Sequence, residues 1–295
     1  MSIGRIGPEQ RKTILSDAPR GPAGSQSRSR DYDGPMTAAP IGRRVAFFGG
    51  SFDPPHLGHL AVARAARDAF HLDTVLFAPV GAQSLKPEGS SVSFEHRLAM
   101  TRLAIEGQPG FAVSLADAPK SPDGRGLKPN YTIDTLEGLR SDFKPDCALY
   151  CLMGADSFFG LRRWHRAAEI PYAAALIVAS RPGQPLAGLK SALPRGLTLE
   201  PAPDPARNDS DRNEAGANHS DVAVRAFFIV NPAGKRAPFY VLPGLDVEIS
   251  ASEVREAIRK AGRGASTGAQ PGSEAVQTML PAAVAEYIRV NGLYR

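Results

Sequence analysis

Two histidines three residues apart follow a pair of glycines and a pair of prolines near the amino end of this chain. The run Gly49–Leu60 reads GGSFDPPHLGHL and comes directly after the apolar stretch Val45–Phe48. Glycines at the end of a strand let a ligand approach the backbone, and the first turn of a helix offers unpaired N–H groups that suit a phosphate. Because residues i and i+3 share one helix face, His56 and His59 can face the same anion. The run therefore predicts a nucleotide phosphate site.

A second candidate phosphate contact lies near the carboxyl end, in the segment Ile249–Arg255. Ser250 is suited to cap the amino end of a helix, and Glu253 three residues later completes a capping box. Arg255 presents a planar guanidinium, which can pair with two phosphate oxygens at once. Taken alone, the segment indicates only a well-capped helix.

The elements that must position these residues follow from alternating strand and helix patterns. We expect strands at Val45–Phe48, Thr74–Pro79, Phe111–Leu115, Cys147–Met153 and Ala173–Ala179, and helices at Leu57–Phe70, Ser93–Glu106, Thr132–Ser141, Ala251–Lys260 and Pro281–Asn291. This alternation predicts an α/β fold with a doubly wound, mostly parallel sheet and a small C-terminal helical part. Ligands of such sheets lie beyond the carboxyl ends of the strands, where Gly49–His59 and Gly154–Asp156 both fall.

Two stretches interrupt this pattern. Residues 1–42 are rich in Gly, Pro, Ser and Arg without sustained periodicity, so we expect a disordered extension before one domain at 43–295. Residues 183–221 are dense in Pro, Gly, Asn, Asp and Ser, and we expect a flexible insertion in which Leu193–Leu199 can pair as an edge strand. A low-complexity patch, Gly262–Gly272, falls within the helical part at 250–295.

Composition narrows the class of protein. The 295 residues are 42% hydrophobic and 22% charged, as in ordinary globular proteins, and no run approaches the ~20 apolar residues of a membrane span. Residues 1–44 hold eight Lys/Arg and four Asp/Glu and thus most of the net charge of +5. The body is therefore not expected to bind nucleic acid, although the basic tail leaves that role open. Cys147 and Cys151 share one strand face and are expected to be reduced core residues in a cytoplasmic protein.

Together these segments resemble the HxGH nucleotidyltransferase superfamily, and GGSFDPPHLGHL as a whole is similar to bacterial nicotinate-nucleotide adenylyltransferases. Ile249–Arg255 resembles the ISxTxIR motif of that superfamily, with Ser252 in place of Thr and Val254 in place of Ile. Both replacements keep the hydroxyl or the apolar branch. The resemblance covers roughly residues 44–182 and 223–294, and it implies a Rossmann-like fold. It also implies transfer of the adenylyl group of ATP to nicotinate mononucleotide, with release of pyrophosphate.

Weaker matches agree with these two motifs. Asn130–Leu136 is similar to the family's SYTxDTL segment beside the nicotinate ring, and Gly154–Ser157 resembles its GxD turn near the ATP ribose and adenine. Trp164, the chain's only tryptophan, occupies the position of a family aromatic that stacks on the pyridine ring. Arg181 and Lys86 match a family arginine and a family lysine that lie near phosphates.

The resemblance thus implies a set of site residues. Catalytic roles fall to His56, His59 and Arg255. ATP is assigned Gly49, Gly50, Ser51, Phe52, His56, His59, Gly154, Asp156, Arg181, Ser250, Ser252 and Arg255. Nicotinate mononucleotide is assigned Lys86, Tyr131, Thr132, Asp134, Thr135 and Trp164. Mg²⁺ is expected to arrive on the ATP phosphates, and no metal site held by the protein is expected. The polyphosphate is expected to favour the protonated form of the imidazoles. A homo-oligomer is compatible with the sequence.

Other functions stay open at this point. Nicotinamide-mononucleotide and phosphopantetheine adenylyltransferases share the HxGH motif and the sheet. The segment Tyr131–Thr135 together with Trp164 favours a pyridine ring and the nicotinate form, while residue types alone do not decide between acid and amide. A non-catalytic nucleotide-binding regulatory module is the alternative of another class, and the intact histidine pair and Arg255 favour an enzyme instead.

Overall fold

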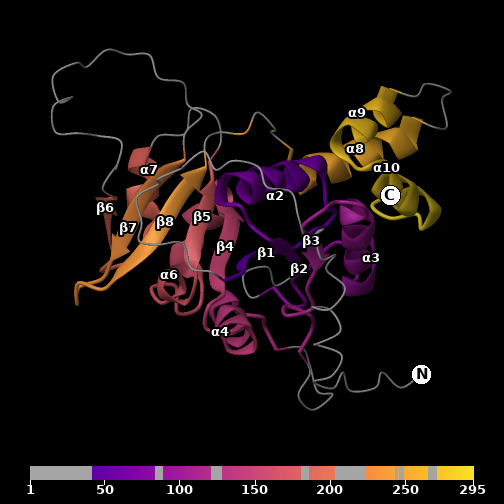
Figure 1. Ribbon diagram of the computed structural model, residues 1–295. Coiled ribbons are helices and arrows are strands. Elements are labelled where there is room, and N and C mark those ends of the chain that lie inside the picture. The colour runs from indigo at the N-terminus through magenta and orange to yellow at the C-terminus, as the bar shows by residue number, and fades with distance from the viewer. Residues whose placement is uncertain are drawn as a thin grey trace, which may run out of the picture.

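The computed structural model describes residues 42–83, 89–120, 128–180, 186–202, 224–242, 245, 249–264 and 271–295. In these residues an eight-stranded sheet carries helices on both faces (Figure 1). The strands are β1 (Arg44–Gly50), β2 (Thr74–Pro79), β3 (Phe111–Val113), β4 (Ala148–Gly154), β5 (Ala175–Ala179), β6 (Thr198–Pro201), β7 (Arg225–Val230) and β8 (Arg236–Leu242). The helices are α2 (Leu57–Phe70), α3 (Phe94–Ile105), α4 (Thr132–Asp142), α5 (Ala155–Phe159), α6 (Ile170–Ala173), α7 (Leu186–Ala192), α8 (Ala251–Gly264), α9 (Pro271–Met279) and α10 (Ala282–Val290), with a 3₁₀ turn η1 (Leu161–Arg163).

The strand order is β3-β2-β1-β4-β5-β8-β7-β6. The neighbours from β3 to β8 are parallel, whereas β7 pairs antiparallel with both β8 and β6. The doubly wound, mostly parallel sheet expected from the sequence is therefore confirmed. The chain reverses its direction of travel across the sheet between β1 and β4, and such a switch point opens a crevice beyond the carboxyl ends of the two strands.

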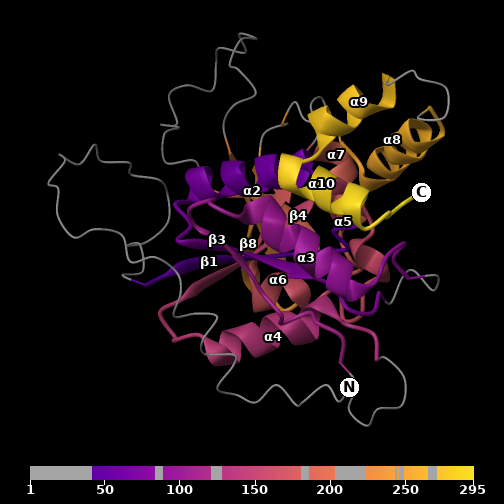
Figure 2. The same ribbon diagram turned by 90° about the vertical axis from the view of Figure 1, so that its right-hand side faces the viewer.

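Two buried clusters fill the two faces of the sheet. One contains the inward residues of α4 and α5, such as Leu136 and Phe158. The other contains those of α2, α3, α8 and α10, such as Leu60, Met100 and Val254. Figure 2 shows this division directly, with α2 and α8–α10 above the sheet and α4 and α6 below it. Because apolar residues alternate along β1, β4 and β5 between the two clusters, these central strands are buried on both sides.

The chain departs from the sequence-based expectations in its second half. Within the stretch 183–221, for which the sequence predicts a flexible insertion, residues 186–202 include α7 and β6, while 203–221 lie outside the described residues. The edge strand is Thr198–Pro201 rather than Leu193–Leu199, because Leu189 and Leu193 are buried against the core and the chain reaches the sheet only afterwards.

The hairpin of β7 and β8 was not expected at all. Its turn is set by Asn231, whose side-chain oxygen accepts hydrogen bonds from the N–H groups of Ala233 and Lys235, and by Gly234 at φ +77°. This local chemistry is typical of a tight connection between antiparallel strands. Helix α9 begins inside the patch Gly262–Gly272, whose low complexity concealed it; residues 265–270 lie outside the described part of the chain.

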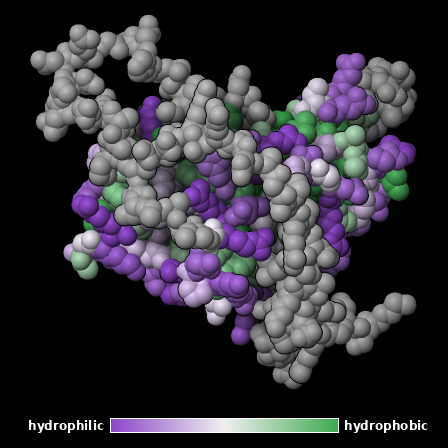
Figure 3. Space-filling model, viewed as in Figure 1, coloured by the Kyte–Doolittle hydropathy of each residue, from purple (hydrophilic) through white to green (hydrophobic). Residues whose placement is uncertain are grey.

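On the face of the molecule shown in Figure 3, the described residues form a mixture of hydrophilic and hydrophobic areas and do not present one broad apolar area. Among the described helices, none has the length and apolar character needed to cross a bilayer. Cys147 and Cys151 are free, and burial raises the pKa of the Cys151 thiol to about 12.

Candidate active site

The loop between β1 and α2 turns sharply at the switch point. A side chain on Gly49 would come within 2.7 Å of the Phe47 ring, so only glycine fits there. Phe52 adopts φ +46°, and its buried ring packs 4.9 Å from the ring of His59. The Phe52 ring therefore packs against a histidine and is too deeply buried to contact a ligand itself.

His56 and His59 stand at the start of α2 as a close pair. Their ring centroids are 3.7 Å apart, and the backbone N–H of His56 donates to Nδ1 of His59 at 3.1 Å. Since Nδ1 of His59 accepts this bond, the neutral ring carries its proton on Nε2 and can donate it to an anion. Gly58 is buried, and a Cβ there would lie 3.0 Å from Nδ1 of His56. The spacing of the motif is thus a packing requirement as well as a chemical one.

Burial disfavours the protonated form of both imidazoles. Burial lowers the pKa of His56 to about 4, against an opposing effect of Glu253. Burial, followed by the charge of His56, holds the pKa of His59 well below its ordinary value. Loss of solvation is the largest effect on the pKa of both rings, whereas a neighbouring polyphosphate is expected to raise these pKa values.

Arg255 joins the carboxyl-terminal motif to the histidine loop. Its Nη1 donates to the carbonyl oxygen of Asp53 at 2.7 Å, and its Nη2 donates to Oγ of Ser252 at 3.2 Å. The expected capping box of α8 is present, since the N–H of Glu253 donates to Oγ of Ser250 and the N–H of Ser250 donates to Glu253. Two segments 202 positions apart in the sequence therefore form one site.

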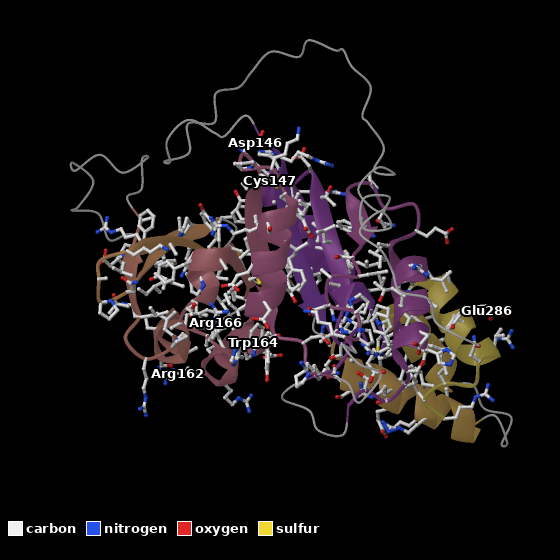
Figure 4. The ribbon with its side chains drawn as sticks, turned by 90° about the horizontal axis from the view of Figure 1, so that it is seen from below. Asp146, Cys147, Arg162, Trp164, Arg166 and Glu286 are labelled. Atoms are coloured by element: carbon white, nitrogen blue, oxygen red, sulfur yellow. The ribbon has the colours of Figure 1, made fainter. Side chains whose placement is uncertain are left out.

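A cavity of about 340 Å³ opens beside this loop, between the carboxyl ends of β1 and β4. Seven of the residues predicted to bind a substrate line it: Gly49, Gly50, Ser51, Tyr131, Thr132, Asp156 and Trp164. Figure 4 shows Trp164 beyond the carboxyl end of β4, while Cys147 lies at the opposite end of that strand. His56, His59, Ser250, Ser252 and Arg255 do not line this cavity and form the adjoining end of the site. The site thus combines an aromatic cavity with the adjoining histidine pair and the guanidinium of Arg255.

Three further predicted residues do not line the cavity. Asp134 points toward Arg166, with 3.6 Å between the carboxylate and the guanidinium, and does not line the cavity. Thr135 is buried, and its hydroxyl donates to Asp117. Gly154 ends β4 next to the cavity without lining it. Lys86 and Arg181 fall outside the described residues.

The structure adds residues that the sequence reading missed. Asp117 lines the cavity as a buried carboxylate, and burial raises its pKa against the opposing hydrogen bond from Thr135. Asn130 also lines it, accepting from the N–H of Ala82 and donating to the carbonyl of Ala118. His165 stacks on Tyr131 with ring centroids 4.3 Å apart. Asn130 and His165 adjoin the recognised motifs and could have been found from them, whereas no local pattern marks Asp117.

Comparison with known proteins agrees with this geometry. Residues 47–257 match the family model described as cytidylyltransferase-like. A probable nicotinate-nucleotide adenylyltransferase of Citrifermentans bemidjiense is 32% identical over 85% of this chain and 98% of its own length. One of Aeromonas hydrophila is 36% identical over 88% of this chain and 99% of its own length.

The fold has a counterpart among solved structures. A Plasmodium falciparum nicotinic acid mononucleotide adenylyltransferase complexed with NaAD superposes with a TM-score of 0.55 and 15% identity, over 85% of this chain and 97% of that one. At that identity the likeness supports the fold alone. The family model and the relatives above 30% identity carry the assignment further: the chain belongs to the nicotinate-nucleotide adenylyltransferases, within the cytidylyltransferase-like family.

Proposed function

We propose that this protein transfers the adenylyl group of ATP to nicotinate mononucleotide, forming nicotinate adenine dinucleotide and pyrophosphate in NAD biosynthesis. An oxygen of the 5′-phosphate of the mononucleotide attacks the α-phosphorus of ATP. The bond from that phosphorus to the oxygen bridging to the β-phosphate breaks, and pyrophosphate leaves with the electron pair. The proposal rests on relatives that are named probable nicotinate-nucleotide adenylyltransferases.

The observation that carries the proposal is the hydrogen bond from Arg255 to the carbonyl of Asp53, three residues before His56. One triphosphate can therefore meet the imidazoles and the guanidinium together. Nε2–H of His59 would donate to an α-phosphate oxygen as charge develops there, and Arg255 would neutralise the departing pyrophosphate. Transfers of this kind need positioning and charge neutralisation and no covalent nucleophile.

The aromatic part of the cavity would hold the second substrate. Trp164 and Tyr131 line this part of the cavity, and Asn130 and Thr132 add polar groups that can orient a mononucleotide. An aromatic subsite favours a pyridine ring over the pantetheine arm of the phosphopantetheine alternative. Recognition of the acid over the amide is part of the proposal, and direct competition between the two mononucleotides measures it.

Mg²⁺ would reach the site on the ATP phosphates. The carboxylate within the loop, Asp53, is already bonded to the N–H of Ser91 and the hydroxyl of Tyr294, and the described residues hold no cluster of three or more His, Cys, Asp or Glu suited to a metal. When bound, the ion would neutralise phosphate charge while keeping several water ligands. We place the reaction in the cytoplasm, which suits the two free cysteines.

The experiment mixes the purified protein with Mg-ATP and nicotinate mononucleotide and identifies the products by mass. The expected products are nicotinate adenine dinucleotide and pyrophosphate in equal amounts. ATP binding without pyrophosphate release would instead support a non-catalytic nucleotide-binding module. A product formed only with the amide or with phosphopantetheine would redirect the proposal to those enzymes.

A further inference from the structure

The last turn of the chain reaches back to the loop that precedes the histidines. The hydroxyl of Tyr294 donates to Oδ1 of Asp53 at 2.7 Å, across 241 positions of sequence. The Asp53 side chain is buried, and its other oxygen accepts the N–H of Ser91 at 2.6 Å. Neither Tyr294 nor the carboxylate of Asp53 belongs to the site residues identified from the sequence. The bond nevertheless reaches the residue on whose carbonyl Arg255 rests.

A second buried charged residue, Arg97, also holds this loop. Arg97 is 2% exposed, and its two terminal nitrogens donate to the carbonyls of Ser51 at 2.7 Å and Val80 at 2.8 Å. The short segment Ser51–Asp53 is thus fixed through both of its ends: by Arg97 at Ser51, and by Arg255 and Tyr294 at Asp53. Of these three residues, Arg97 belongs to α3 and Arg255 to α8, whereas Tyr294 follows α10 near the carboxyl end of the sequence.

We infer that Tyr294 is a positioning residue for the triphosphate, acting through Asp53 on Arg255. The phenol fixes the Asp53 carboxylate, which fixes the direction of the Asp53 carbonyl, which in turn aims the guanidinium. That guanidinium has five N–H donors. Its hydrogen bonds to Asp53 and Ser252 use two of them and set the direction of the others. The inference rests on the proposed function, because it assigns the aimed group to ATP. Burial, with the hydrogen bond to Asp53, raises the pKa of Tyr294, so the phenol stays a donor throughout the assay range.

The substitution Tyr294→Phe removes only the donating hydroxyl. We expect the KM for ATP to rise roughly tenfold, the loss expected for one hydrogen bond to a charged group. The KM for nicotinate mononucleotide should stay within about twofold, because Trp164 and Tyr131 belong to other elements. The matched control is Tyr287→Phe. The hydroxyl of Tyr287 forms a hydrogen bond with Nδ1 of His96 at 3.0 Å, which joins α10 to α3 without reaching the loop. That variant should lose stability without changing the KM for ATP.

A double-mutant cycle tests whether Tyr294 acts on ATP binding through Arg255 or only stabilises the loop. In an Arg255→Ala background, Tyr294→Phe should change kcat/KM for ATP by less than twofold, since the group it positions is gone. Full additivity of the two substitutions would overturn the inference, as would an unchanged KM for ATP in Tyr294→Phe. Calorimetric titration with Mg-ATP alone gives the same comparison without turnover. A chain that binds ATP in this pattern but does not adenylylate nicotinate mononucleotide would sink the proposed function and leave the role of Tyr294 standing.

Discussion

Acidification should destabilise this protein through His56. Burial lowers the pKa of this imidazole from 6.5 to about 4, so the folded state binds fewer protons than the unfolded state between these two values. The free energy of unfolding then falls as the pH drops through 6.5 and stops falling from this source below pH 4. The stabilisation is fully present above pH 6.5, and its loss is the mark of a histidine kept neutral by burial.

The size of the effect follows from the same two values. At ~1.36 kcal/mol for each tenfold change in proton affinity, complete protonation of His56 costs the folded state about 3 kcal/mol. Between pH 7 and pH 5 the loss is about 2 kcal/mol, because the folded imidazole is still mostly neutral at pH 5. The side chain is 6% exposed, so little solvent screening reduces this figure. Burial lowers the pKa of His59 as well, so its protonation changes the stability in the same direction.

Urea denaturation at pH 7, 6 and 5 measures this in the wild type and in His56→Asn. His56 is the N-cap residue of α2, and asparagine is a preferred N-cap residue, so the variant keeps α2 capped while it removes the titrating group. The variant should lose about 2 kcal/mol less than the wild type between pH 7 and pH 5. The same substitution at exposed His71, at the other end of α2, controls for removal of an imidazole as such. Parallel pH profiles for wild type and His56→Asn would refute the reasoning.

Three further predictions concern the site. His59→Ala should lower kcat at least about a hundredfold, since one such electrostatic contact is worth ~2.7–4 kcal/mol; steady-state assays with near-normal turnover would remove the assigned role. Trp164→Ala should raise the KM for nicotinate mononucleotide roughly tenfold, and that for ATP much less, by loss of ~1–3 kcal/mol of stacking; equal rises would argue against a ring subsite. Thr135→Val should cost about 1–3 kcal/mol of stability at pH 7 by leaving Asp117 unpaired. That cost should shrink at pH 5, because burial raises the pKa of Asp117 and the neutral acid needs the bond less; a pH-independent loss in urea denaturation would contradict this.

Local spacing accounts for what the sequence could predict. The continuous segment from Val45 to Phe70 predicts a strand, a glycine turn and a helix. The structure contains this strand and helix as β1 and α2. The capping box at Ser250 and Glu253 is equally local. In both cases the interacting groups lie three or four residues apart, so their geometry depends on backbone dihedrals that the sequence itself favours.

The segment after Asn130 shows what local spacing cannot predict. A helix turns by about 100° for each residue, so consecutive residues of a motif cannot all face one ligand. Tyr131 and Thr132, at the start of α4, line the cavity, while Asp134 turns outward to Arg166 and Thr135 turns inward to Asp117. The orientation of a helix about its own axis is set by the core beneath it, and that information is tertiary.

Burial of charge is the other property that no local pattern reveals. The pKa values of the two imidazoles, and the burial of Arg97, depend on which distant segments cover them. Burying a guanidinium costs free energy, and the Nε of Arg97 has no hydrogen-bond partner among the described atoms. Apolar residues of similar volume often stabilise a fold as well as buried charges do. Stability alone therefore does not explain why a guanidinium, a carboxylate and a phenol meet at Ser51–Asp53. Their hydrogen bonds instead fix the directions of two carbonyl groups beside the histidines, and a site whose chemistry is positioning requires that those directions not vary.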